Sequence, residues 1–274
     1  MRGEPTRLAT PRLNRRRLTG EQTDVVNEKL SAFGASRGED GSCRLSATWG
    51  SGRDMKVHGD YGADGYALIE GLVPAEVAAA MLDCVGAGLG GPDSRFAAFQ
   101  SQEMLTRHPT IEIPGHSFLP MLTFLWGLTP IISELTGRDL LPSYDYFRIY
   151  QKGDICRLHT DRASCEHSLS MTLRYSDDQP WPLDIARLPS DGPVSRLDED
   201  FGEEAYNSIA MQPGDAVLYR GVERRHGRIT PNPNRSSAHL FLHWVERGGE
   251  YQDHAFDAAR LAEVRQQQRM PSIF

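Results

Sequence analysis

Cysteine is sparse in this sequence, which has four in 274 residues. No two of them have C-x-x-C spacing, so neither a disulfide framework nor a structural zinc site is expected. A long hydrophobic run is also missing, because no stretch approaches the roughly 18 apolar residues that a membrane-spanning helix needs. The first residues lack the apolar core of a secretory signal. We therefore expect a cytoplasmic protein with no membrane partner.

An overall excess of positive charge is absent too, since the formal net charge is −7. This balance argues against a surface built to hold nucleic acid, and it favours a small molecule or short peptide as the partner. Positive charge is local, because residues 1–20 contain Glu4 as the one acid among six arginines: Arg2, Arg7, Arg12, Arg15, Arg16 and Arg17. We predict a solvated arm here, with a docking segment as the alternative. Nothing in the sequence indicates the oligomeric state.

The composition changes along the chain, and the changes predict its organisation. Residues 1–60 are rich in Arg, Gly, Ser and Thr, and we predict a partly disordered basic extension with one helix over residues 21–33. A folded domain is predicted over residues 61–250, followed by a helical C-terminal tail over residues 251–274. The length suits one large domain with a sizeable core.

The predicted elements are helical first and extended later. A short strand is expected over residues 65–72, a helix over 75–85 after Pro74, and a buried helix over 118–135 that is interrupted around Thr129 and Pro130. Such helices would cover one side of a sheet. Short apolar or aromatic runs then predict strands over residues 144–151, 168–175, 181–186, 216–221 and 238–245, a pattern typical of a barrel or sandwich. An acidic loop over residues 189–208 is predicted to be a solvated insertion, with a lid as the alternative.

One local motif points to metal chemistry. His159 and Asp161 follow a strand-like run, and side chains two residues apart in extended chain point to the same face. A second imidazole, from His226 in the loop after the strand over residues 216–221, would complete three ligands. Two histidines and one carboxylate with open positions suit Fe(II) oxygen chemistry, although a His-x-Asp motif alone is weak evidence.

A cation for binding a carboxylate follows nine positions after His226. Arg235 and Ser237 open the strand over residues 238–245 and would lie on one face of it. A buried guanidinium beside a hydroxyl can bind a carboxylate bidentately. Without further context, however, Arg235 would be a surface charge near a turn.

Several short motifs together resemble the Fe(II)- and 2-oxoglutarate-dependent dioxygenases, specifically a little-characterised subgroup of the prolyl-hydroxylase-like branch. The resemblance covers about residues 65–246. It rests on the segments YFRIYQKGD at 146–154, HTDR at 159–162, CEHS at 165–168, WPL at 181–183, PGD at 213–215, YRG at 219–221 and FLHW at 241–244.

The resemblance implies a mainly β fold with flanking helices and a double-stranded β-helix core, the jelly-roll or cupin-like barrel. It implies that His159, Asp161 and His226 bind Fe(II), and that Arg235 pairs with the distal carboxylate of 2-oxoglutarate, with Arg228 as the competing partner. Tyr150 and Tyr175 match positions of aromatic hydroxyls near that cosubstrate, and Ser237 would lie beside Arg235. Without the resemblance, both tyrosines would be ordinary strand aromatics.

The implied activity is hydroxylation of an unactivated C–H bond of a small molecule, amino acid or short peptide, with consumption of O2 and release of succinate and CO2. The carboxylate of Asp161 favours oxidation over halogenation, because halogenating relatives lack it. Desaturation or cyclisation at the same iron remains open. So does a non-catalytic metal- or ligand-binding barrel, whereas a zinc hydrolase is disfavoured because nothing resembles its usual base. His239 and His243 are further candidates for lining the pocket, and Cys165 and Glu166 for a role in the site.

Overall fold

The computed structural model describes residues 33–37, 43–47, 55–88, 99–101, 104–190 and 196–267. The basic arm lies outside this part of the chain, as does the helix predicted over residues 21–33 apart from its last residue, Phe33. That residue begins β1 (Phe33–Arg37), which pairs with β2 (Cys43–Ala47) in an antiparallel hairpin. A hairpin therefore forms within the segment that was predicted to be a partly disordered extension.

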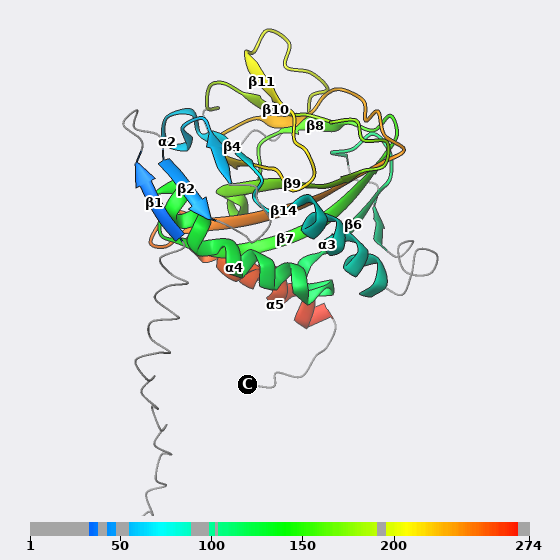
Figure 1. The fold of residues 1–274 in the computed structure, drawn as a ribbon. Helices are drawn as coiled ribbons and strands as arrows, with labels where there is room; N and C mark the ends of the chain where they lie inside the picture. Colours follow the sequence, from blue (N-terminus) through cyan, green and yellow to red (C-terminus); the bar gives the residue numbers. More distant parts are fainter. Residues whose placement is uncertain are drawn as a thin grey trace, which may run out of the picture.

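Two antiparallel sheets form the jelly-roll core, as predicted. The larger has the order β3-β4-β12-β9-β14-β7-β6-β5, and the smaller has the order β11-β10-β13-β8. Figure 1 shows the smaller sheet above the larger one. The larger sheet contains β3 (Lys56–His58), β4 (Tyr66–Glu70), β5 (Gln100–Ser101), β6 (Thr110–Pro114), β7 (Leu140–Gln151), β9 (His167–Tyr175), β12 (Ala216–Arg220) and β14 (Ser236–Glu246). The smaller contains β8 (Cys156–His159), β10 (Leu183–Ala186), β11 (Tyr206–Ile209) and β13 (His226–Arg228).

Helices cover the outer face of the larger sheet. Figure 1 shows α3 (Ala75–Gly88) and α4 (Leu119–Thr136) on this face, with α5 (Ala258–Gln267) beside α4. The remaining helical turns are α2 (Tyr61–Asp64), η2 (Gly115–Ser117), η3 (Ala163–Cys165) and η4 (Gln252–Asp257). The main hydrophobic core lies between α3, α4 and the sheet. It contains Leu125 and Ile132 of α4 together with Phe147 and Leu240 of the sheet, all fully buried.

The break predicted near Pro130 is absent, because α4 runs through this residue. Proline removes one backbone donor from the helix. Burial of Leu125 before Pro130 and of Ile132 after it holds both halves of α4 against the sheet. The helix ends instead at Gly137, which has a left-handed φ of 66°. By length and composition alone, α4 could cross a membrane, which corrects the expectation that no segment is long and apolar enough. Core helices of soluble proteins can also be this long and apolar.

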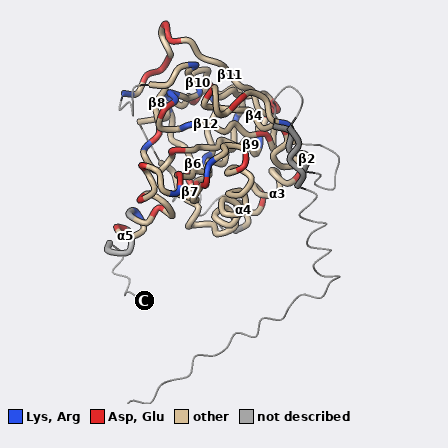
Figure 2. Tube along the Cα trace, turned by 90° about the vertical axis from the view of Figure 1, so that its left-hand side faces the viewer, with Lys and Arg blue, Asp and Glu red and all other residues tan. Residues whose placement is uncertain are grey.

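The acidic loop between β10 and β11 is ion-paired to the sheet. Its Asp198 lies 2.7 Å from Arg225, which also pairs with Glu204, and its Glu199 lies 2.8 Å from Arg157 of β8. The backbone carbonyl of Asp198 accepts a hydrogen bond from Leu158 at 2.8 Å. Figure 2 shows acidic segments of this loop next to β8 and β10. The described part of the loop is exposed over much of its length, in line with the prediction of a solvated insertion, and its acids also brace the small sheet.

The brace predicts unequal effects for two arginines. We expect Arg225→Ala to lower the free energy of unfolding by about 2 kcal/mol, because it leaves two half-buried carboxylates, Asp198 and Glu204, without their cation. The matched control is Arg247→Ala, which breaks an exposed pair with Asp139. That change should cost less than about 0.5 kcal/mol. Urea unfolding followed by circular dichroism measures both, and equal losses would show that the loop does not brace the sheet.

Candidate functional site

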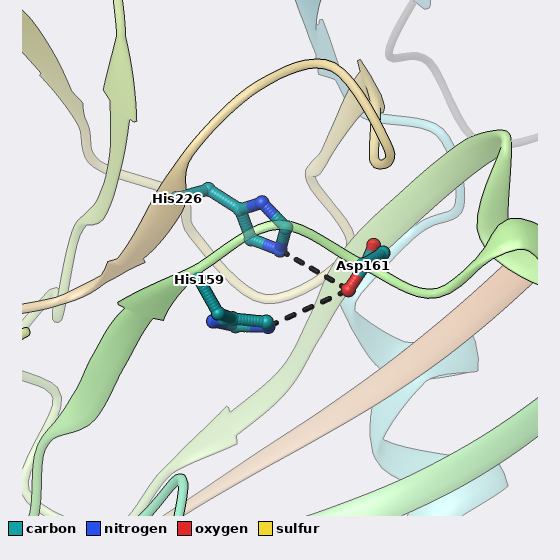
Figure 3. A group of neighbouring side chains, drawn as sticks. All are labelled: His159, Asp161 and His226. Atoms are coloured by element: carbon teal, nitrogen blue, oxygen red, sulfur yellow. Dashed lines mark ion pairs between the residues drawn. The ribbon is translucent and has the colours of Figure 1, made fainter. Parts of the chain in front are cut away.

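Strand pairing in the small sheet brings the predicted metal ligands together. His159, at the end of β8, is the Cα partner of His226, at the start of β13. Asp161 follows two residues after His159. Its Oδ1 atom lies 3.4 Å from Nε2 of His159 and 3.5 Å from Nε2 of His226. Figure 3 shows the two imidazoles and the carboxylate pointing toward one another. The three predicted residues thus form one cluster.

Each imidazole is oriented by a hydrogen bond from its Nδ1 to a backbone carbonyl. Nδ1 of His159 donates to the carbonyl of Arg157 at 2.8 Å, and Nδ1 of His226 donates to the carbonyl of Arg224 at 2.8 Å. The proton on Nδ1 leaves a lone pair on each Nε2, directed at the centre of the cluster. Burial lowers the pKa of His159, and the neighbouring His226 lowers it further. A neutral imidazole is the form that binds a metal ion.

The carboxylate of Asp161 is also held in place. Ser168 donates from Oγ to its Oδ2 at 2.8 Å, and the backbone N–H of Asp161 donates to Gly221 at 2.8 Å. A Cβ atom on Gly221 would lie 2.3 Å from that Oδ2, so only glycine allows this approach. Burial alone would raise the pKa of Asp161, but the facing imidazoles and their hydrogen bonds hold it well below its usual value. The cluster therefore offers two nitrogens and one anionic oxygen, the ligand set that suits non-haem iron.

Two cavities meet at this cluster. The outer one has a volume of about 650 Å³ and extends from His159 and Asp161 to α4, η4 and α5. The inner one is a narrow void of about 10 Å³ that reaches Arg228. Residues that line both are Leu105, Tyr146, Arg148, His159 and Asp161. The cluster is therefore approached from two sides, one wide and one narrow.

The structure does not bring Arg235 into the site. Its guanidinium is 76% exposed and pairs with Asp177 at 2.9 Å, because β14 begins only at Ser236 and Arg235 lies at the turn before it. Ser237 is buried but donates to Asn232 at 2.8 Å, and it lines neither cavity. The prediction of an Arg235 and Ser237 clamp inside the barrel is therefore wrong.

Arg228 occupies the place that was predicted for Arg235. It lies on β13, two residues after His226, and is 1% exposed. Its Nη2 contacts Ser170 at 3.3 Å and Nδ1 of His239 at 3.4 Å, and its Nε has no hydrogen-bond partner. Within the described part of the chain, no carboxylate lies within ion-pair distance of it, although burial raises the pKa of the Asp184 carboxyl and the charge of Arg228 partly lowers it. A buried cation without an acid is costly unless a ligand supplies the anion.

The other predicted residues divide between the inner cavity and its surroundings. Tyr150 lines the inner cavity, and its hydroxyl accepts from Arg148 at 3.2 Å. Tyr175 lines neither cavity. Its hydroxyl donates to the carbonyl of Trp181 at 3.3 Å. His239 is fully buried beside Arg228, and burial and that arginine lower its pKa well below the usual value. His243 lies against Tyr144, and its Nδ1 donates to Oγ of Ser168 at 2.9 Å, because the hydroxyl proton of Ser168 is donated to Asp161.

Two groups of cavity residues were not predicted. Tyr144, Tyr146 and Arg148 line the outer cavity, and period-two alternation from Tyr150 along β7 could have found them. Arg148 is buried like Arg228, but it pairs with Glu112. The second group, which lies in η4 and α5, has no motif that would have marked it: Phe256, Asp257, Arg260 and Leu261. Cys165 also lines the outer cavity, whereas Glu166 accepts from the backbone of Glu246 at 2.7 Å.

Comparison with protein-family models and with curated protein sequences found no match. Comparison with solved structures found several similar folds. One is the non-haem α-ketoglutarate-dependent carbocyclase SnoK from nogalamycin biosynthesis, with a TM-score of 0.53 and 8% identity over 68% of this chain and 82% of that one. Another is HygX from Streptomyces hygroscopicus with nickel and 2-oxoglutarate bound, with a TM-score of 0.50 and 9% identity over 68% of this chain and 84% of that one.

The chain has the fold of the 2-oxoglutarate-dependent non-haem iron oxygenases. The α-ketoglutarate-dependent epimerase SnoN from nogalamycin biosynthesis shares this fold at a TM-score of 0.50 and 12% identity, over 68% of this chain and 80% of that one. An epimerase and a carbocyclase on one fold show that the fold does not determine the reaction. The reaction therefore depends on the residues of the site.

The hydrogen bond from Ser168 predicts a weaker metal site when it is removed. We expect Ser168→Ala to lower the affinity for Fe(II) or Co(II) by roughly 10- to 100-fold, because Asp161 loses the donor that orients it. Anaerobic titration followed by the Co(II) spectrum measures this. Ser176→Ala, at a half-buried position beside Asp177 and away from the cluster, is the control and should bind normally. Unchanged affinity in Ser168→Ala would mean that the backbone alone orients Asp161.

Proposed function

We propose that this protein is an Fe(II)- and 2-oxoglutarate-dependent oxygenase that hydroxylates a small molecule, an amino acid or a short peptide. The observation that carries the proposal is a pair of features in one barrel. A cluster of two histidines and one carboxylate lines the same inner cavity as a buried guanidinium, which has no carboxylate within ion-pair distance in the described part of the chain. The first feature suits a divalent iron ion, and the second suits the anionic end of a cosubstrate.

His159, Asp161 and His226 would hold the iron. Their donor atoms all lie within 4.8 Å of one another, close to the pairing of β8 with β13. The two Nδ1 hydrogen bonds fix the orientation of the imidazoles. Iron bound there would supply the activation of O2 and the oxidation of a substrate C–H bond, with 2-oxoglutarate consumed to succinate and CO2. The carboxylate of Asp161 occupies the third ligand position, which favours hydroxylation over halogenation.

Arg228 is the residue that we assign to the distal carboxylate of 2-oxoglutarate. Of the three arginines considered, Arg235 is exposed and paired with Asp177, and Arg148 is paired with Glu112. Arg228 alone among these is buried without an acid, and it lines the inner cavity together with the metal ligands. Nickel and 2-oxoglutarate bound to HygX, which shares the fold, support the assignment of these ligands.

The inner cavity must widen to admit a dicarboxylate. Its volume of about 10 Å³ has room for about one water molecule. Leu105 is half-buried and lines both cavities, so its displacement would connect the inner cavity with the outer one. Substrate would occupy the outer cavity. Half-buried Tyr146, which lines both cavities, stacks at 4.8 Å on buried Phe241 of the inner one, and the two rings exclude water from one side of the cluster.

The first experiment is anaerobic titration of the protein with Fe(II) and then 2-oxoglutarate, followed by visible absorption. We expect a charge-transfer band from bidentate chelation. His159→Ala should abolish it. Arg228→Ala should raise the Kd of 2-oxoglutarate by roughly 100-fold, because a bidentate charge-assisted pair contributes about 2–4 kcal/mol.

Arg235→Ala is the matched control, because it removes an arginine that pairs with Asp177 at the surface. The Kd of 2-oxoglutarate should be unchanged in this variant. A larger effect of Arg235→Ala than of Arg228→Ala would reverse the assignment. Tight metal binding without a charge-transfer band in the wild-type protein would contradict the oxygenase proposal. It would favour a barrel that holds metal without catalysis. Succinate release with candidate substrates then tests turnover.

A further inference from the structure

The outer cavity contains a buried acid that the proposed reaction does not use. Asp145 lies on β7, is 3% exposed and lines the cavity. Its Oδ2 atom has no hydrogen-bond partner. The side chain packs against the bare Cα of Gly115, where an added Cβ atom would lie 1.7 Å from Oδ1. A glycine at this position therefore makes room for a carboxyl group whose Oδ2 gains no hydrogen bond.

The charged groups around Asp145 do not neutralise it. From the neighbouring strand β6, Glu112 is paired with Arg148, and from η4, Asp257 lies 3.8 Å from Arg162. His116 of η2 and Arg260 of α5 line the same cavity but are exposed, and neither lies within ion-pair distance of Asp145. The residues that α4 contributes, Leu122 and Trp126, are uncharged. Across the described chain, Asp145 thus has no cation.

The cavity connects Asp145 with the metal ligands around the edge of the large sheet. β6 ends at Pro114, opposite Tyr146, so β7 has no described strand beside Asp145 on that edge. The outer cavity passes this edge, because it is lined by His159 and Asp161 and also by Asp145 and Gly115. Its lining includes the rings of Trp126 and Phe256, which meet edge to face at 6.2 Å, together with the ion-paired Arg162 and Asp257.

We propose that the substrate carries a protonated amine or guanidinium group that pairs with Asp145 while its reacting carbon lies at the metal end of the cavity. This inference rests on the proposed function for its reaction, although the binding of the cation does not depend on the metal. A cationic group that reaches this carboxyl would supply the partner that the buried Oδ2 lacks, and an apolar or aromatic body would contact Trp126 and Phe256 in the same cavity.

The protonation of Asp145 gives the binding a defined pH dependence. Burial raises the pKa of Asp145 from 3.8 to about 7. The carboxyl is then mostly neutral at pH 6 and mostly ionised at pH 8, so a cationic ligand should bind more tightly as the pH rises through 7. Because the folded pKa lies above the unfolded one, the group also destabilises the fold progressively as the pH rises from about 4 to 7. Asp145→Asn should therefore raise the Tm at pH 8 and change it little at pH 4.

The test compares amines with neutral isosteres by isothermal titration calorimetry on the full chain, with and without Ni(II) and 2-oxoglutarate. The probes are phenethylamine and 4-phenylbutylamine, each against the alcohol of the same length. At pH 8 we expect at least one amine to bind about 10-fold more tightly than its alcohol. The preference should shrink at pH 6 and vanish in Asp145→Asn. Asp257→Asn, which alters a cavity acid already paired with Arg162, is the matched control and should keep it.

Each outcome decides the proposal. An amine preference that is present in the wild type and lost in Asp145→Asn supports it, and a raised Tm of that variant at pH 8 shows that the loss is not a folding defect. Equal binding of amines and alcohols, no binding of either amine, or a preference that survives in Asp145→Asn overturns it. Failure of the proposed oxygenase function would appear separately, as an amine preference in a protein that shows no charge-transfer band.

Discussion

The site depends on the register between β8 and β13. These short strands place His159 opposite His226, and a slip of one residue would turn one imidazole to the other face of the sheet. Two features maintain the register. Gly227 lets β13 approach β8 closely, since a Cβ atom there would lie 2.5 Å from the carbonyl of Cys156. The acids of the loop between β10 and β11 bind Arg157 beside the first ligand and Arg225 beside the second. Surface ion pairs therefore hold the ligands of a buried site.

The distribution of buried charge explains why the barrel interior can hold ionic ligands. Asp161 is anionic and Arg228 is cationic, but they do not pair with each other, since neither lies within 4.0 Å of the other. Asp161 has Ser168 and two facing imidazoles as partners, whereas Nε of Arg228 has none. A divalent metal and a dicarboxylate would each bring a charge opposite to one of these two groups. The cost of holding Arg228 and Asp161 apart is consistent with a site prepared for two ligands.

The sequence was sufficient to predict that His159, Asp161 and His226 lie together and that strands occur at β7, β9, β10, β12 and β14. The spacing of the first two residues and the apolar runs of the strands are local patterns. His159 and Asp161 share a two-residue spacing, and a run such as residues 238–245 has enough alternating apolar positions to be recognised. It was not sufficient to choose between Arg228 and Arg235. β13 has three residues, too few to show alternation, and the point at which β14 begins is set by its pairing with β7 and β9. The continuation of α4 through Pro130 depends on tertiary packing, which local propensity does not contain.

The C-terminal segment, η4 and α5, covers the edge of β7 and lines the outer cavity, which no motif in its sequence predicts. Because β6 stops opposite Tyr146, the edge of β7 would be open at Asp145, and η4 covers it, with Ser143 donating to the carbonyl of His254 at 3.1 Å. η4 contributes Phe256 and Asp257 to the outer cavity, and α5 contributes Arg260 and Leu261. One part of the outer cavity is built from the barrel, at His159 and Asp161, and another part is built from this C-terminal segment. Changes in η4 and α5 can therefore alter the shape and charge of the cavity without any change in the strands that place His159 opposite His226.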